Sequence, residues 1–130
     1  MPTSDARSHA RPPIDAAALE VARDDVPNEE ILDGVVAAFR ALSDPTRARI
    51  LYALLRRPLY VRDLALLIGV SESAISHQLR FLREHHLVKR DRRGNAMAYS
   101  LDDHHVAVLF REAEYHADHV RRGISDHPYP

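Results

Sequence analysis

Gly69 separates two segments with helical periodicity and constrains the fold more than any other residue of the chain. Val61 to Ile68 and the segment from Ser71 to His85 carry apolar residues at helical spacing. Glycine suits the left-handed residue that ends a helix, and serine is a favoured first cap of the next one. The pattern predicts a helix-turn-helix, in which the second helix enters the major groove of DNA.

The second of these helices has an apolar and a polar side. The apolar side is expected to be buried and consists of Ala74, Ile75, Leu79 and Leu82. Small hydroxyls, an amide and arginine suit contacts to base edges and phosphates. The residues expected to contact DNA from this helix are Ser71, Ser73, Ser76, His77, Gln78 and Arg80. The alternative interpretation is an ordinary pair of antiparallel helices with a polar outer face.

A basic β-hairpin is predicted directly after the second helix. Residues 87–92 and 96–101 have the composition of strands, and the sequence around Gly94 predicts the turn between them. A basic hairpin in this position is typical of a wing. The residues expected to reach the DNA backbone or minor groove from it are Arg92, Arg93 and Asn95.

The charge distribution agrees with a polyanionic partner for the middle of the chain. The formal net charge is −1, yet residues 44–95 contain eleven Lys or Arg residues and only five acidic ones. A basic middle between acidic ends favours binding to nucleic acid. The chain has no cysteine, which excludes disulfides and leaves histidine, carboxylate, backbone or water as metal ligands.

The N-terminal part is expected to contribute a tail and helices. Residues 1–13 predict a disordered tail, and Ile14 to Arg23 a short helix. Asn28 is the expected cap of a longer helix, and Asp44 of the next one, with proline at its first position. The apolar stripe expected to join the core from the longer helix is Ile31, Leu32, Val35, Val36, Phe39 and Leu42.

The last long segment combines helical periodicity with four candidate metal ligands in the pattern D-x-H-x10-H-x-x-H. His116 and His119 are three residues apart and share a helix face. Asp103 and His105 are two apart, which brings them together only if Asp103 is the helix cap, a position that aspartate favours. The apolar stripe of this helix, from Val106 to Val120, predicts either core packing or a dimer seam.

The distance between the two pairs of candidate ligands requires two chains. His105 and His116 are separated by eleven residues, roughly 16 Å along a helix. Two ligands of one zinc ion lie within about 4 Å of each other. One straight helix cannot bring both pairs to one ion, but two antiparallel copies can. The spacing therefore predicts a two-fold homodimer with two equivalent intersubunit sites.

Length bounds the domain organisation. The 130 residues predict one domain over residues 14–122, followed by a C-terminal tail, 123–130. No apolar run reaches the length of a membrane-spanning helix, and the N-terminus lacks the layout of a signal peptide. We therefore expect no membrane partner and a cytoplasmic protein.

Three stretches give the chain a family likeness. They are F-R-A-L-S-D-P-T-R-A-R-I-L, V-R-D-L-A-L-L-I-G-V-S-E-S-A-I-S-H-Q-L-R-F-L-R and L-D-D-H-H. The segment from Ile31 to Arg121 resembles the ArsR/SmtB family of metal-sensing winged-helix repressors. The resemblance implies a mainly α-helical homodimer, joined through its terminal helices, that binds operator DNA without metal and releases it on metal binding.

The resemblance also implies residue roles. Asp103 and His105 match one half of an interhelical zinc site, often also a cobalt site, and His116 and His119 of the other protomer match its second half. The residue that matches His116 donates to the backbone carbonyl just after the recognition helix, which here is His86. The cysteine site of other members is absent. A third subgroup senses nickel and cobalt with ligands from the chain ends, for which His9 and His127 are the candidates.

The functional prediction is a zinc-responsive repressor, with Co(II) or Ni(II) as alternative effectors. A second hypothesis is a winged-helix repressor that answers to a non-metal signal and uses these histidines structurally. A third is a zinc hydrolase, but catalytic zinc needs an open coordination position. Four protein ligands along a helix pair would close the coordination sphere, so an enzyme is not expected.

Overall fold

The computed structural model describes residues 10–123, and the predicted ligands His9 and His127 lie outside them. The chain forms two compact units, Met1–Val36 and Ala37–Pro130, which are described separately.

The first unit contains α2 (Ala16–Asp25) and the first part of α3 (Glu29–Leu42). Asp15 caps α2 by accepting from the Ala18 amide at 2.9 Å. Asn28 accepts from the Ile31 amide at 2.9 Å, which confirms the predicted start of α3.

The apolar stripe of α3 was predicted to join the core, and within the second unit this is confirmed for Leu42, which packs against the core, but not for Phe39. Ile31 is 56 % exposed and Phe39 54 %, and Leu32, Val35 and Val36 are exposed as well. Of the fourteen residues of α3, Ala41 is buried. The periodicity correctly indicated an amphipathic helix, but periodicity does not specify whether its own chain or a second one covers the apolar face.

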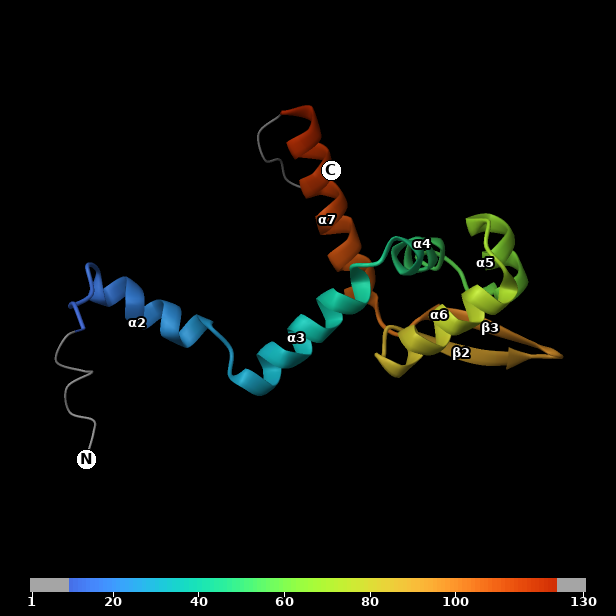
Figure 1. Ribbon diagram of the computed structural model, residues 1–130, viewed down its shortest axis with the longest axis horizontal. Helices are drawn as coiled ribbons and strands as arrows, with labels where there is room; N and C mark the ends of the chain where they lie inside the picture. The colour runs from blue at the N-terminus through green and yellow to red at the C-terminus, as the bar shows by residue number, and fades with distance from the viewer. Residues whose placement is uncertain (1–9, 124–130) are drawn as a thin grey trace. The chain divides into compact units, whose positions relative to one another are not determined.

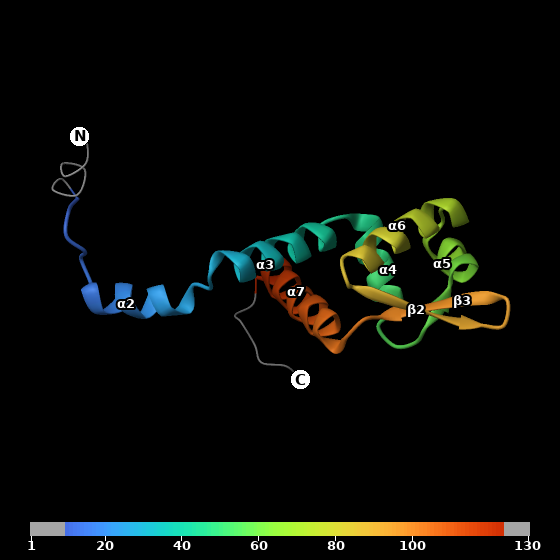
Figure 2. The same ribbon diagram turned by 90° about the horizontal axis from the view of Figure 1, so that it is seen from below.

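The second unit contains the end of α3 from Ala37 onward, three further helices, a small sheet and the long last helix (Figure 1). Its elements are α4 (Pro45–Ala53), β1 (Leu59–Tyr60), α5 (Val61–Ile68), α6 (Glu72–Glu84), β2 (Val88–Arg93), β3 (Ala96–Leu101) and α7 (His104–Arg122). Figure 2 shows α4, α5 and α6 grouped on one side of the hairpin formed by β2 and β3. The order of elements confirms the predicted winged helix-turn-helix.

The turn between α5 and α6 forms as predicted. Gly69 ends α5 in the left-handed region at φ 83°, where an L side chain would be strained. The Ser71 hydroxyl then accepts from the Ala74 amide at 3.0 Å and caps α6. Asp44 likewise caps α4 by accepting from the Arg47 amide at 3.0 Å, with Pro45 at the first helical position.

The sheet has the strand order β1-β3-β2, with both pairings antiparallel. Arg93 pairs with Ala96, so Gly94 and Asn95 form a two-residue turn. Gly94 has φ 63° and Asn95 no positive φ, the pattern of a type II′ turn. The short strand β1 was not predicted, because two residues carry no periodicity and Leu59 pairs with Tyr99, forty positions away.

The core joins Ala41 at the end of α3, the helices α4, α5 and α6, the sheet and the first half of α7. Its fully buried large side chains are Ile50, Leu51, Leu64, Ile75, Leu79, Leu82 and Val88. Replacing such a leucine with alanine costs about 2–5 kcal/mol of stability. Ala74, which was expected on the buried side of α6, is exposed, because it lies one residue before Ile75 at the edge of the apolar stripe.

Candidate metal centre and nucleic-acid interface

The start of α7 holds Asp103 and His105 together. Asp103 is the helix cap in extended conformation, and its Oδ1 accepts from the His105 amide at 2.8 Å. The same Oδ1 lies 3.2 Å from His105 Nδ1. The prediction that capping brings these two side chains to one place is confirmed, and both are exposed.

The far half of α7 holds His116 and His119, whose ring centroids are 5.3 Å apart. One continuous helix carries both pairs, so the separation between them is roughly 16 Å. Within residues 10–123 of one chain, no group of three or more candidate ligands comes together. A site that combines Asp103 and His105 with His116 and His119 would therefore need a second chain.

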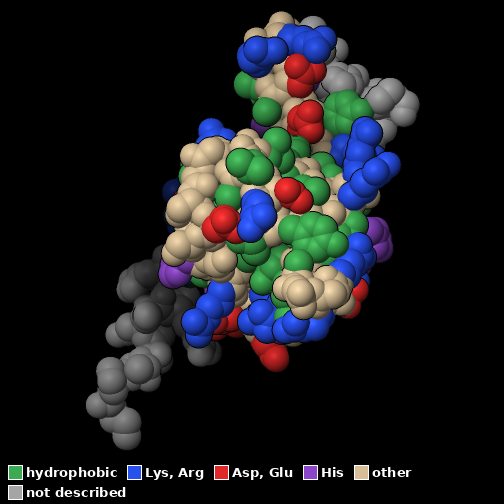
Figure 3. Space-filling view, turned by 90° about the vertical axis from the view of Figure 1, so that its right-hand side faces the viewer, with side chains coloured by type: hydrophobic (Ala, Val, Ile, Leu, Met, Phe, Trp, Pro, Cys, Tyr) green, Lys and Arg blue, Asp and Glu red, His purple; other side chains and the backbone are tan. Residues whose placement is uncertain are grey.

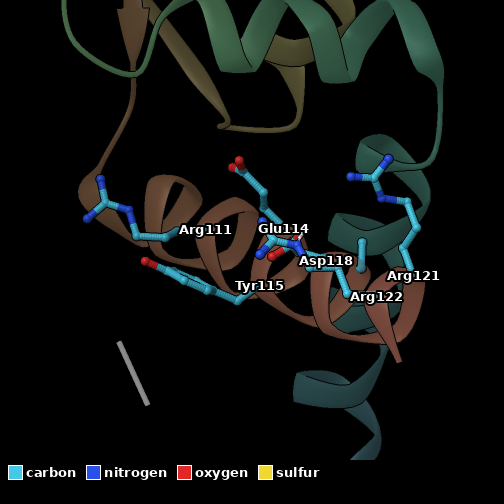
Figure 4. Close-up of a pocket in the computed structure, with 7 residues that line it drawn as sticks. Arg111, Glu114, Tyr115, Asp118, Arg121 and Arg122 are labelled. Atoms are coloured by element: carbon cyan, nitrogen blue, oxygen red, sulfur yellow. Dashed lines mark hydrogen bonds and ion pairs between the residues drawn. The ribbon is translucent and has the colours of Figure 1, made fainter. Parts of the chain in front are cut away.

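A different face of α7 carries charged side chains. Figure 4 shows the labelled residues of this face around a shallow hollow, and all residues that line it belong to α7. They include Arg111, Glu114, Asp118, Arg121 and Arg122, and Arg122 Nε lies 2.9 Å from Asp118 Oδ1. At 3.6 residues per turn this face lies roughly opposite His105 and His116. None of the four candidate ligands lines the hollow.

The exposed polar stripe of α6 is narrower than predicted. Ser73, Ser76, His77 and Arg80 follow one another at spacings of three, one and three residues and are all exposed. Gln78 is half-buried, because it lies at the border of the face that buries Leu82. Ser71 is exposed, but its hydroxyl oxygen is already engaged as the cap of α6.

Two of the candidate DNA-contacting arginines form ion pairs with acidic neighbours. Arg80 Nε lies 3.2 Å from Glu84 Oε1, and Arg93 Nε lies 3.6 Å from Asp91 Oδ2. All four side chains are more than half exposed. Exposed pairs of this kind contribute about 0–1 kcal/mol, so a phosphate group can replace either acid at little cost.

The end of the molecule that carries α5, α6 and the hairpin is chemically mixed. Figure 3 shows hydrophobic side chains gathered there among Lys and Arg side chains. Arg92, Arg93 and Asn95 are exposed at the hairpin end. The hydrophobic residues Leu66 and Leu67 of α5 are exposed. The basic residues suit phosphate contacts.

His86 has an unusual backbone at the end of α6. Its φ is 57°, and it is the one non-glycine residue with positive φ in the described part of the chain. The Leu87 amide donates to Leu82 O at 2.9 Å and the His86 amide to Arg83 O at 3.1 Å. This is the Schellman pattern, whose left-handed position is usually glycine. Histidine in that position is locally strained, and strain of this kind concentrates at functional sites.

Two residues of α4, Arg47 and Tyr52, contact other helices. The sequence patterns did not identify either of them. Arg47 contacts α3 and α6, and Tyr52 contacts α7. Burial, and next the negative charge of Glu114, raise the pKa of Tyr52 from its ordinary value of 10.0. The hydroxyl therefore stays protonated at neutral pH and donates to Phe110 O at 3.3 Å. Neither contact has a signal in the spacing of residues.

Within residues 10–123, no helix is both long enough and apolar enough to cross a membrane.

Comparison with known proteins agrees with this architecture. Residues 44–90 match the family model described as "Bacterial regulatory protein, arsR family". The "HTH-type transcriptional regulator NmtR" of Mycobacterium tuberculosis (strain ATCC 25618 / H37Rv) is 50 % identical over 95 residues, 72 % of this chain and 79 % of that protein. The "Transcriptional repressor SmtB homolog" of Synechocystis sp. (strain ATCC 27184 / PCC 6803 / Kazusa) is 53 % identical over 83 residues, 64 % of this chain and 61 % of that protein.

Solved structures share the fold. The solution structure of apo-NmtR gives a TM-score of 0.65 at 46 % identity, over 79 % of this chain and 87 % of that one. The homodimeric winged helix-turn-helix DNA-binding domain of Mb0332 from Mycobacterium bovis gives a TM-score of 0.69 at 27 % identity. The match covers 76 % of this chain and 92 % of that one. These relatives are regulators, which confirms that the chain is not an enzyme. From the shared fold, the matched residues 44–90 and the identity to NmtR, it follows that the chain belongs to the arsR family of bacterial regulatory proteins.

Proposed function

We propose that the protein is a metal-responsive transcriptional repressor that binds operator DNA as an apo homodimer and releases it when Zn(II) binds. One observation carries the proposal: a single continuous helix holds an Asp-His pair at its start and a His-His pair in its second half. Only a second, antiparallel copy can combine the two pairs into one site. Metal binding and dimer geometry are thereby linked.

The donor set fits the metal. Three imidazoles and one carboxylate, from Asp103, His105, His116 and His119, satisfy a tetrahedral divalent ion, and zinc suits this set best. Cobalt and nickel accept the same donors. A nickel or cobalt sensor that adds His9 or His127 is the alternative within the family.

A second copy also has an apolar surface to cover. Exposed apolar side chains lie on α3, where Ile31 and Phe39 are more than half exposed, and on α7, where Leu109 and Val120 are exposed. Exposed apolar residues on helices are typical of helices that pack against another chain. The proposed homodimer is therefore joined through its terminal helices. The structurally similar domain of Mb0332 is homodimeric, which supports a dimer.

Operator DNA would be read by α6 and held by the wing. The exposed side chains of Ser73, Ser76, His77 and Arg80 suit base edges and phosphates, with Ser71 and Gln78 at the edges of that stripe. Arg92, Arg93 and Asn95 would contact the backbone or minor groove. Because its ligand is operator DNA, we expect the repressor in the cytoplasm.

Release requires a coupling free energy between the metal and DNA sites, typically 1–3 kcal/mol. Metal-bound imidazoles usually donate their second N–H to a nearby acceptor. His116 would donate to the His86 carbonyl, at the left-handed end of the recognition helix. Metal on α7 would thereby fix the end of α6.

Zinc uptake and operator binding test the proposal together. Equilibrium dialysis is expected to give two zinc ions per dimer, and operator affinity should fall at saturating zinc. His105→Ala should abolish tight uptake, whereas the matched control His104→Ala, one residue away on α7, should retain it. Absence of stoichiometric uptake by the wild type would contradict the proposal and favour a repressor with a non-metal signal.

A further inference from the structure

Helix α4 contacts both the helix that carries the candidate ligands and the helix that carries the candidate DNA contacts. Its first turn contains Arg47 and its last turn contains Tyr52. The two side chains leave α4 at opposite ends and each meets an aromatic residue of another helix.

At the first end, Arg47 joins three helices. Its Nε donates to Ala41 O at 2.7 Å and its Nη2 to Arg40 O at 3.3 Å, which satisfies carbonyls in the last turn of α3. Its guanidinium carbon lies 4.3 Å from the centroid of the Phe81 ring on α6. Only a planar guanidinium can donate through its edge to two carbonyls and stack its face on a ring at once.

Phe81 lies on the same helix as the exposed polar stripe of α6, which consists of Ser73, Ser76, His77 and Arg80. It lies four residues after His77, one turn further along α6, and its ring is also stacked on His85 with centroids 4.2 Å apart. A shift of Phe81 relative to α4 therefore moves or rotates the exposed residues of α6 as one body. A movement of about 1–2 Å is typical for helices in switching transitions.

At the C-terminal end of α4, Tyr52 contacts α7. Its ring centroid lies 4.8 Å from that of Phe110, and its hydroxyl donates to the backbone carbonyl of the same residue. Phe110 is buried, so the contact lies at the edge of the core rather than on a mobile surface. Phe110 lies in the middle of α7, between His105 and His116.

We propose that α4 is a strut that transmits movement of α7 to α6, with Arg47 and Tyr52 as its two positioning residues. This inference rests on the proposed function, because it requires that metal on α7 weakens DNA binding by α6. It adds a second path, inside each protomer, by which metal binding on α7 would affect DNA binding by α6. This path does not use the His86 carbonyl. Neither residue is one of the candidate ligands or candidate DNA contacts, and both would act through Phe110 and Phe81.

The competing interpretation is that Arg47 and Tyr52 only stabilise the fold. Loss of a purely structural brace would change operator affinity by the same factor with and without metal. Loss of a strut would change the ratio of the two affinities. The ratio therefore separates the two roles, whereas affinity or stability alone does not.

The test measures operator dissociation constants without metal and at saturating zinc for full-length variants. Arg47→Met keeps the apolar stem of the side chain but loses its donors and charge, and Tyr52→Leu loses the ring contact and the hydroxyl. Both should lower the zinc-dependent ratio by about fivefold or more while zinc affinity in the absence of DNA changes little. The ratio for Arg47→Lys should lie between those of Arg47→Met and wild type. Lysine keeps a positive charge, but it cannot donate to two carbonyls and stack on the Phe81 ring at once. Arg49→Met, an exposed arginine on the same helix, should keep the wild-type ratio.

Circular dichroism melts would establish that each variant is folded at the assay temperature. An unchanged ratio in folded Arg47→Met, or in folded Tyr52→Leu, would overturn the strut. A wild-type ratio of one would instead overturn the proposed function, and the strut with it. These results are distinguishable because the wild-type ratio is measured first.

Discussion

The rings of His116 and His119 lie with centroids 5.3 Å apart on one helix, and the second pair, Asp103 and His105, meets at the other end of that helix. In the proposed metal centre, each chain would thus supply two half-sites that cannot meet each other. This arrangement makes the intersubunit site testable by complementation.

The first prediction uses two defective chains. A chain with Asp103→Ala and His105→Ala retains one half-site, and a chain with His116→Ala and His119→Ala retains the other. Neither homodimer should bind zinc tightly. A mixed dimer should bind one ion, because one complete site is restored across the interface. Dialysis of the refolded mixture measures this. If each double variant alone still binds two ions per dimer, other ligands hold the metal.

The second prediction concerns the wing. Replacing Arg92 or Arg93 with alanine should weaken operator and non-specific DNA binding alike, because arginines of a wing contact phosphates. Each lost contact should reduce the slope of log K against log salt by about 0.9. Arg23→Ala is a matched control, since Arg23 is also an exposed, ion-paired arginine but lies outside the helix-turn-helix and hairpin. An unchanged slope in both wing variants would show that the hairpin does not contact DNA.

Helix ends were predictable because their signals are local. Asn28, Asp44, Ser71 and Asp103 each bond a backbone amide two or three residues away, so the sequence alone contains both partners. The turn at Gly69 follows from the same short-range chemistry. The helix-turn-helix and the pairing of Asp103 with His105 could therefore be predicted from the order of residues.

Contacts between distant elements could not be predicted in this way. Tyr52 and Phe110 are 58 positions apart, and nothing in the spacing of either helix indicates that they meet. The strand at Leu59 exists only through its pairing with β3. His86 was expected just after the recognition helix, but it adopts a left-handed conformation that is usual for glycine, so its backbone conformation carried no local signal.

The third prediction concerns alkaline pH. The pKa of Tyr52 is raised above 10.0 in the folded chain, so its stabilising contribution is fully present below pH 10.0 and is lost as pH rises through the folded pKa. The unfolded chain ionises first, which favours unfolding. Because the residue is 39 % exposed, the effect should be small.

Urea unfolding of wild type and Tyr52→Phe at about pH 8 and about pH 10.5 measures this effect by difference. The other titrating residues are common to both chains and cancel. Wild type should lose more stability between the two pH values than Tyr52→Phe does. Equal losses would mean that ionisation of Tyr52 costs the fold nothing.

The last prediction concerns the proposed link from His116 to the His86 carbonyl. Asparagine at position 116 still offers an oxygen ligand but lacks the second imidazole N–H. His116→Asn should therefore retain part of the zinc affinity and lose most of the zinc-driven release of DNA. His119→Asn, the matched control one turn away, should lose zinc affinity but keep release at saturating zinc. Both variants need zinc titrations and operator titrations with and without zinc. If His116→Asn binds zinc and releases DNA like wild type, donation from the imidazole N–H of His116 to the His86 carbonyl is not part of the switch.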